Sequence, residues 1–112
     1  MYSVIRRYKT SSVHEVVKRI QKEFLSVVTS APGFVAYFVI DEDNGIQSSI
    51  SIFQTREHAD YSNKLAAHWV KEHALFLLGS PEITSGEVVI HVIGPQPASG
   101  VEAVSEDSEA SG

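Results

Sequence analysis

The sequence predicts an α+β domain in which two helices cover one face of a four-stranded antiparallel sheet. Two stretches, residues 10–28 and 55–78, carry apolar residues at helical spacing. Short runs rich in β-branched and aromatic residues precede, separate and follow these stretches, and an Asn-Gly pair divides the middle run into two arms of a hairpin. The resulting order is βαββαβ, the ferredoxin-like arrangement.

The first half supplies one strand and one helix. Residues 2–9 form the first strand, and residues 10–28 form a helix that Ser11 or Ser12 caps at its start. Pro32 and Gly33 end this helical segment. One face of the predicted helix is apolar and faces the core, made of Val13, Val16, Val17, Ile20, Phe24, Val27 and Val28.

The second half begins with a hairpin. The strand over 34–41 is apolar at every position but the last, and Asn44-Gly45 favours a turn with positive φ angles. In the returning strand, 46–54, isoleucines alternate with glutamine and serine. Thr55 is the expected N-cap of the second helix, and a last strand is expected over 82–94.

Composition narrows the classes of function. The 112 residues fit one domain over 1–94, followed by a disordered, acidic tail over 95–112 that is rich in Pro, Gly and Ser. Outside the tail, ten acidic residues face nine basic ones, so no basic surface for nucleic acid is expected. The chain has no cysteine and no long apolar run, which favours a cytoplasmic protein without disulfides, membrane spans or a signal peptide.

The strands predict a homodimer. In the strand over 34–41, Phe34, Ala36, Phe38 and Ile40 are expected to point one way while Val35, Tyr37 and Val39 point the other, so both faces of the sheet need cover. Two helices can cover only one face. A second copy of the sheet, stacked face to face about a twofold axis, is the simplest cover for the other.

Two segments, and a short pattern within the second, resemble a known family. The stretch "APGFVAYFVID", the stretch "SISIFQTREHAD" and the F-x-T-x-E-x-A pattern that leads into the second helix resemble the dimeric α+β barrel superfamily, in particular its antibiotic biosynthesis monooxygenase-like (ABM-like) domains, over roughly residues 1–93. The resemblance implies a dimer through stacked sheets and a pocket between helices and sheet. Members include cofactor-free quinone-forming monooxygenases and haem-degrading enzymes, and many have no assigned activity.

The helical period places Trp69 and His73 on the side of the second helix that faces the sheet, beside the small residues Ala59, Ser62 and Ala66. Three interpretations of His73 stay open: a core histidine with one hydrogen bond, a general base or acid, and a ligand of haem or a metal. Trp69 is either core or a wall of a substrate pocket.

The catalytic signatures of the resembled family do not carry over intact. Haem-degrading members have an asparagine on the first strand, where this chain has Arg6 and Arg7, and only His73 matches by position. Quinone-forming members have an asparagine and a tryptophan one turn apart on the second helix. Asn63 can match that asparagine, but Trp69 lies about 120° around the helix from it.

Arg6 and Arg7 are adjacent on a strand, so one of them must point toward the helices or into the dimer interface. Either its head group lies at the end of the sheet, in solvent or paired with Glu87, or it binds an anionic or enolate oxygen of a ligand.

If the protein is an enzyme, the resemblance implies a cofactor-independent monooxygenase that acts on a small aromatic or enolisable substrate. The expected catalytic residues are His73 and Asn63, and the expected substrate-binding residues are Trp69, Arg7, Phe38 and Tyr37. No cofactor or metal is expected. A non-catalytic ligand-binding or accessory protein is the alternative, which a filled helix–sheet interface and a hydrogen-bonded His73 would favour; a haem-binding or haem-degrading protein comes third.

Overall fold

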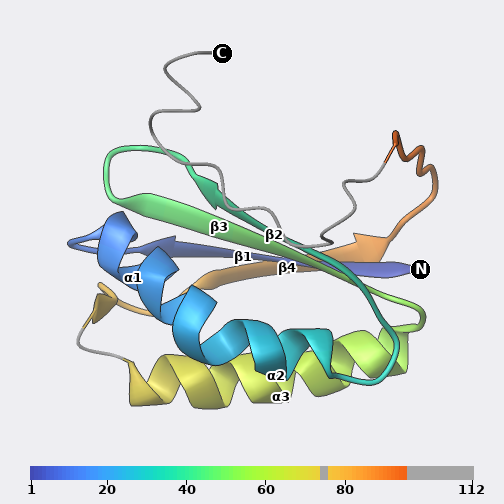
Figure 1. Ribbon diagram of the computed structural model, residues 1–112, viewed down its shortest axis with the longest axis horizontal. Coiled ribbons are helices and arrows are strands. Elements are labelled where there is room, and N and C mark those ends of the chain that lie inside the picture. Colours follow the sequence, from blue (N-terminus) through green and yellow to red (C-terminus); the bar gives the residue numbers. More distant parts are fainter. Residues whose placement is uncertain (74–75, 96–112) are drawn as a thin grey trace.

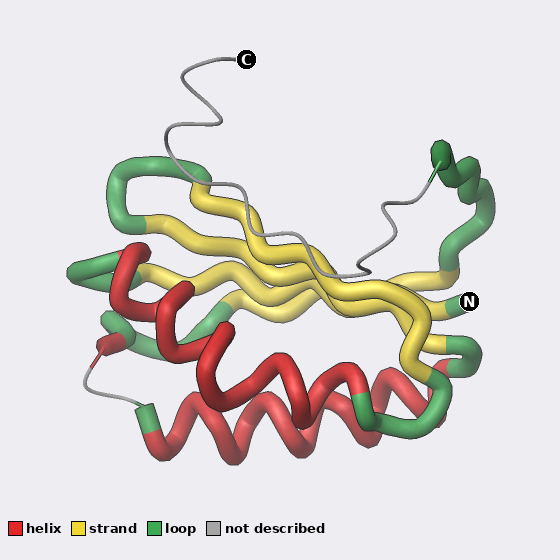
Figure 2. Tube along the Cα trace, viewed as in Figure 1, coloured by secondary structure: helices red, strands yellow, loops and turns green. Residues whose placement is uncertain are grey.

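The computed structural model describes residues 1–73 and 76–95, and it confirms the predicted α+β, ferredoxin-like order (Figure 1). Four antiparallel strands form one sheet in the order β2-β3-β1-β4. The helices lie together on one side of this sheet (Figure 2). The elements are β1 (Tyr2–Lys9), α1 (Val13–Arg19), η1 (Ile20–Phe24), α2 (Leu25–Thr29), β2 (Phe34–Asp41), β3 (Ile46–Phe53), α3 (Arg56–Glu72) and β4 (Glu82–Glu87). The predicted tail lies outside the described residues from 96 onward.

The first helical segment starts where the sequence predicts. Ser12 is its N-cap and accepts a hydrogen bond from the backbone N–H of Glu15 at 3.2 Å. One π-helical turn, η1, interrupts the segment, and there the Leu25 N–H bonds to the Ile20 carbonyl. Such turns insert one extra residue and occur often at functional sites. The apolar spacing did not predict this turn.

The predicted hairpin between β2 and β3 is confirmed. Asp43, Asn44 and Gly45 all have positive φ angles, of 68°, 54° and 75°. The Glu42 N–H closes the turn on the Ile46 carbonyl at 2.9 Å.

The helix α3 begins as predicted, with Thr55 accepting from the His58 N–H at 3.2 Å, but it ends at Glu72 rather than at residue 78. The chain instead turns back to the sheet. The Leu78 N–H donates to the Lys9 carbonyl at 2.8 Å, and Leu77 bridges to Thr10 and is buried. Backbone pairing with the end of β1 therefore replaces the last helical turns.

The expected strand over 82–94 is also shorter, because β4 ends at Glu87. Its register with β1 runs from Arg7↔Glu82 to Tyr2↔Glu87. One further hydrogen bond, from the Val88 N–H to the Met1 carbonyl, closes this ladder at 2.9 Å.

The strand β3 turns its polar side toward the helices. Residues directly opposite each other in an antiparallel pair point to the same face, and Gln47, Ser49 and Ser51 pair with Tyr8, Arg6 and Val4. All six of these side chains are buried on the helix side. The isoleucines Ile46, Ile50 and Ile52 therefore lie on the opposite side, which we call the open face.

A bulge in β2 interrupts the alternation of side chains that was predicted for this strand. Phe34 pairs with Phe53, but Ala36 pairs with the next residue, Ile52, because the register shifts between Phe34 and Ala36. Phe34 thus packs edge-on against Phe53 on the helix side, with ring centroids 6.1 Å apart. Of the four β2 residues that were expected to point the same way, only Ala36, Phe38 and Ile40 lie on the open face.

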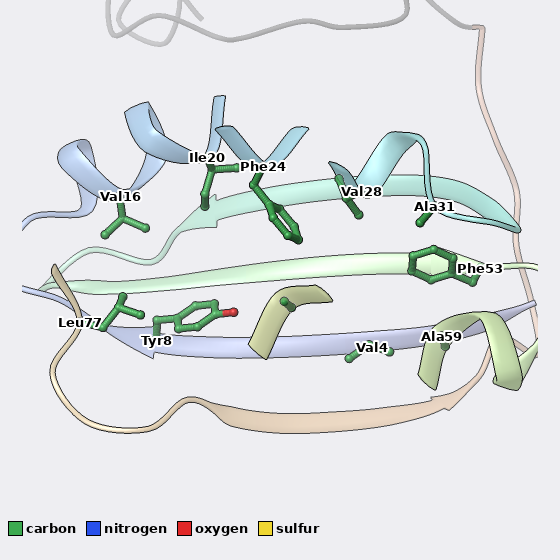
Figure 3. Close-up of a cluster of buried hydrophobic side chains, with 11 residues drawn as sticks. Val4, Tyr8, Val16, Ile20, Phe24, Val28, Ala31, Phe53, Ala59 and Leu77 are labelled. Carbon is green, nitrogen blue, oxygen red and sulfur yellow. The ribbon is translucent and has the colours of Figure 1, made fainter. Parts of the chain in front are cut away.

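The apolar core lies between the sheet and the helices (Figure 3). Figure 3 labels ten of its side chains, which come from β1, the first helical segment and the turn after it, β3, α3 and the segment that follows α3. The open face is not covered: Phe38 is 54% exposed, Ile40 42% and Ile5 40%. None of the described helices combines the length and the apolar character that crossing a bilayer requires.

Candidate functional site

A buried arginine lies at the centre of the helix-facing side of the sheet. Arg6 is only 3% exposed, and its Nη2 donates a hydrogen bond to Oδ1 of Asn63 on α3. Arg7, which the sequence suggested as a pocket residue, lies on the other side of the sheet from Arg6. Arg7 points to the open face, because neighbouring strand residues alternate, and it pairs with Glu42 at 3.4 Å.

The surroundings of Arg6 hold no counter-charge. Within the described part of the chain, no carboxylate lies within salt-bridge range of Arg6. Burial lowers the pKa of its guanidinium, while the phenols of Tyr8 and Tyr37 act in the opposite direction. Arginine still stays protonated at neutral pH. The site therefore contains a desolvated positive charge with neutral partners.

Burial also raises the pKa values of both phenols. For Tyr8, the charge of Arg6 and a hydrogen bond with Ser49 oppose the increase. For Tyr37, the neighbouring Tyr8 adds to the increase, and Arg6 and Ser49 again oppose it. Both phenols stay neutral at physiological pH and can donate or accept hydrogen bonds.

Several polar atoms in this interior lack partners. They are Nε2 and Oε1 of Gln47, Oγ of Ser51 and Nε1 of Trp69. Buried polar atoms are nearly always hydrogen-bonded, to water or a ligand where protein groups do not suffice. The internal cavity beside Arg6, Tyr37 and Trp69 has a volume of about 10 Å³, enough for about one water molecule.

A larger groove of about 450 Å³ lies between the two helical segments. Its walls are Glu23, Phe24 and Val27 on one side and Leu65, His68, Trp69, Glu72 and His73 on the other. Phe24 and Trp69 line both the groove and the internal cavity, with ring centroids 5.7 Å apart. These two rings thus border both the groove and the cavity that Arg6 lines.

His73 lines the groove, and both of its ring nitrogens are engaged. Its Nδ1 lies 2.8 Å from the Trp69 carbonyl, and its Nε2 lies 2.5 Å from Oε2 of Glu23. A carbonyl only accepts, so Nδ1 is the donor of the first contact, and Nε2 is occupied by its contact with Glu23. A general base or haem ligand needs a free lone pair on the ring. In this arrangement His73 has none, and its donor set does not fit haem ligation.

The other predicted site residues divide between the two faces of the sheet. Asn63, Tyr37 and Trp69 lie around Arg6 on the helix side. Phe38, which was expected as a pocket wall, pairs with Ile50 and lies on the open face, away from Arg6. Among the residues that the structure describes, no group of three or more His, Asp or Glu is arranged to hold a metal ion.

Sequence reasoning missed two parts of the site. The polar alternation of Gln47, Ser49 and Ser51 was visible, but alternation does not say which face meets the helices. Glu23 carried no signal, because it is an exposed helical residue fifty positions from His73.

Comparison with known proteins bears on the fold. No protein-family model matches the sequence, and no curated protein matches it significantly. Among solved structures, the ActVA-Orf6 monooxygenase of Streptomyces coelicolor, in complex with nanaomycin D, superposes with a TM-score of 0.66 at 11% identity over 84% of this chain and 92% of its own. SnoaB, a cofactor-independent oxygenase from Streptomyces nogalater, has a TM-score of 0.62 at 10% identity over 81% of this chain and 95% of its own.

A third structure with this fold binds a metal porphyrin. It is a variant of MhuD with two manganese protoporphyrin IX molecules per active site, and it has a TM-score of 0.63 at 15% identity over 84% of this chain and all of its own. These structures share the ferredoxin-like α+β fold of this chain, and their names include antibiotic biosynthesis monooxygenases, the group that the sequence segments resemble. At these identities they establish the fold and leave the chemistry open.

Proposed function

We propose that this chain, which has the ABM-like fold, binds a small ligand that presents an anionic oxygen on a flat apolar body. The observation that supports this proposal is the buried charge of Arg6, which only neutral groups contact. A buried arginine is rare without an anionic partner. A phenolate or enolate oxygen would supply that partner and would also accept hydrogen bonds from Tyr37 and the Trp69 indole.

The groove provides the volume that such a ligand needs. Its 450 Å³ falls within the range of small-molecule pockets, whereas the internal cavity is too small. We expect the ligand to lie in the groove against Phe24 and Trp69. Its oxygen would reach Arg6 when these two rings move apart.

The activity that we propose is cofactor-independent monooxygenation of an enolisable aromatic substrate. A base removes a proton from a CH₂ group, and Arg6 stabilises the resulting enolate oxygen. The carbanion forms a C–O bond with O₂, and the hydroperoxide loses water, so that CH₂ and O₂ become C=O and H₂O. His73 would be the base only after Glu23 moves away from Nε2.

The similarity to two monooxygenase structures supports this activity. The porphyrin in MhuD belongs to that protein, and the engaged nitrogens of His73 argue against haem here. We therefore propose that the protein has no resident cofactor. We also propose that it is a cytoplasmic homodimer in which a second copy covers the open face.

The test uses the single tryptophan, Trp69, as a fluorescent reporter inside the site. Arg6→Gln should weaken binding of a phenolic anthrone more than tenfold, because a hydrogen bond to a charged group contributes about 1.5–3 kcal/mol. Arg7→Gln is the matched control, since it removes the same charge from the other face. Equal affinities in the two variants would exclude Arg6 as the anion site.

The non-catalytic alternative has specific support. The internal cavity is nearly filled, and both nitrogens of His73 are hydrogen-bonded, which are the features expected of a binding protein without catalysis. An oxygen electrode separates the two functions. Fluorescence quenching of Trp69 without O₂ uptake favours the binding protein, whereas O₂ uptake that requires Arg6 favours the monooxygenase.

A further inference from the structure

The polar groups around the internal cavity can all donate hydrogen bonds. They belong to Arg6, Tyr8, Tyr37, Ser49 and Trp69. The guanidinium of Arg6 and the indole of Trp69 only donate, whereas the hydroxyl groups can donate or accept. Among the described residues, no carboxylate and no amide side chain lines the cavity. The cavity therefore suits a guest that accepts hydrogen bonds from several sides at once.

A positive charge and an unpaired donor belong to this cavity. Arg6 is 3% exposed, and the partner of its Nη2 is the uncharged amide of Asn63. Nε1 of Trp69 is buried and has no hydrogen-bond partner within the described part of the chain. A buried charge is costly unless a partner compensates it, and a buried N–H is costly without an acceptor. An anion would meet both requirements, whereas a water molecule would meet only the second.

The volume of the cavity limits which anion can enter. About 10 Å³ is the space of about one water molecule. Carboxylate, phosphate and sulfate groups have several heavy atoms and exceed this space. A monatomic anion is the class that fits, and chloride is the common one in biological solutions. Chloride is slightly larger than water, so it needs a small shift of the Phe24 or Trp69 ring, which border both the cavity and the groove.

We propose that the protein, when it holds no organic ligand, binds one chloride ion in this cavity, against the guanidinium of Arg6 and among the hydroxyl groups and the indole that line it. The ion compensates the buried charge. Such a site would exist whether or not the protein is an enzyme. For the ligand of the proposed function the ion is a competitor, because an enolate or phenolate oxygen would need the same position.

Thermal unfolding in sodium chloride, compared with sodium gluconate at the same ionic strength, tests the site. An ion that binds only the folded protein stabilises it by an amount that grows with the logarithm of its concentration. Gluconate is too large for the cavity and keeps the screening of surface charges equal. We expect Tm to rise with chloride in the native sequence and in Arg7→Gln, whose charge lies on the open face, and not in Arg6→Gln. An equal rise in all three proteins, or no rise in any, would overturn the proposal.

Bromide gives a second readout, because a heavy ion quenches the fluorescence of an adjacent indole and Trp69 is the only tryptophan. Quenching should reach a plateau as the cavity fills, and chloride should reverse it by competition. The bromide concentration at half quenching should rise at least about tenfold in Arg6→Gln. Quenching that increases linearly with bromide, and that chloride does not reverse, would indicate collisions with the ring alone and would contradict the proposal.

Tyr37→Phe keeps the test decisive if Arg6→Gln does not fold. The substitution removes one hydroxyl from the cavity wall and leaves the ring in place. Because a hydrogen bond to a charged acceptor is lost, the bromide concentration at half quenching should rise roughly fivefold or more. Tyr61→Phe, which removes a hydroxyl from the exposed surface of α3, is the matched control. Equal halide affinities in these two variants would exclude a halide from the cavity.

The phenolic anthrone that tests the proposed function also separates the two proposals. Its anionic oxygen would need the position of the ion beside Arg6, so chloride should weaken anthrone binding. Chloride binding without any anthrone binding would support the ion site and remove the proposed function. Anthrone binding that depends on Arg6, together with a Tm that does not respond to chloride, would overturn the ion site and leave the proposed function standing.

Discussion

Replacing Gln47 by methionine should stabilise the protein. Gln47 is fully buried on the helix side of β3, and neither its Nε2 nor its Oε1 has a hydrogen-bond partner. Methionine fills a similar unbranched volume without polar atoms. Each buried unsatisfied polar group costs about 1–3 kcal/mol, so removing two of them should raise the free energy of unfolding by about 2 kcal/mol or more.

The measurement is urea unfolding followed by Trp69 fluorescence, with thermal unfolding by circular dichroism beside it. For a domain of this size, each kcal/mol corresponds to a shift of roughly 4–8 °C in Tm, so an increase near 10 °C is expected. Gln54→Met is the control, because Gln54 is exposed and its replacement should change stability by less than about 0.5 kcal/mol.

A loss of stability in Gln47→Met would refute this reasoning. It would mean that Gln47 is hydrogen-bonded in solution, and that the polar interior is a satisfied core. Increased stability together with weaker ligand binding is the combination expected of a site that trades stability for function.

Three further predictions concern the turn, the phenols and the groove. Gly33→Ala should destabilise the fold by more than about 2 kcal/mol, because φ is +74° and an added Cβ would lie 2.2 Å from the His58 ring; Gly79→Ala, at φ +86° with open space, isolates the backbone cost in urea unfolding. Burial raises the pKa of Tyr37 above its unfolded value of about 10. The stability that the neutral phenol contributes is therefore complete below about pH 10 and is lost as the pH rises above it. In a pH series of unfolding curves, Tyr37→Phe should reduce this loss of stability at high pH. His73→Ala should cost about 1 kcal/mol through its partly exposed contact with Glu23, whereas His68→Ala, which breaks an exposed pair, should leave the urea midpoint unchanged.

Much of the fold was predictable because local signals agree with the tertiary structure. Ser12 and Thr55 cap the helices as their positions suggest, and the Asn44-Gly45 turn adopts the positive φ angles that these residues favour. The two errors in element length share one cause. The periodic pattern continues past Glu72 and Glu87, but backbone pairing with β1 decides where α3 and β4 end.

The site was less predictable because it depends on which face of each strand meets the helices. The pair Arg6-Arg7 indicates that one arginine is inward, but only the register with β3 identifies Arg6. The bulge in β2 similarly separates Phe34 from Phe38. Spacing placed Trp69 and His73 near one another on α3, and it could not foresee that Glu23 would occupy the Nε2 of His73.

The orientation of β3 connects the ligand site with the proposed dimer. Phe53 is fully buried and packs on Phe34, so its side chain must face the helices. The two-residue period of a strand then turns Ser51, Ser49 and Gln47 inward as well, and it turns every isoleucine of β3 outward. If the register of β3 slipped by one residue, three isoleucines would face the helices and Phe53 would face away from them. For a protein that worked as a monomer without a ligand, that slipped register would be the more stable one. The observed register is favourable only if a second copy covers the isoleucines and if water or a ligand satisfies the polar interior. Both conditions follow from the orientation of the same strand. A dimer without its ligand should therefore be less stable than the liganded dimer by RT ln(1 + [L]/Kd), where Kd is the dissociation constant of the ligand bound at Arg6.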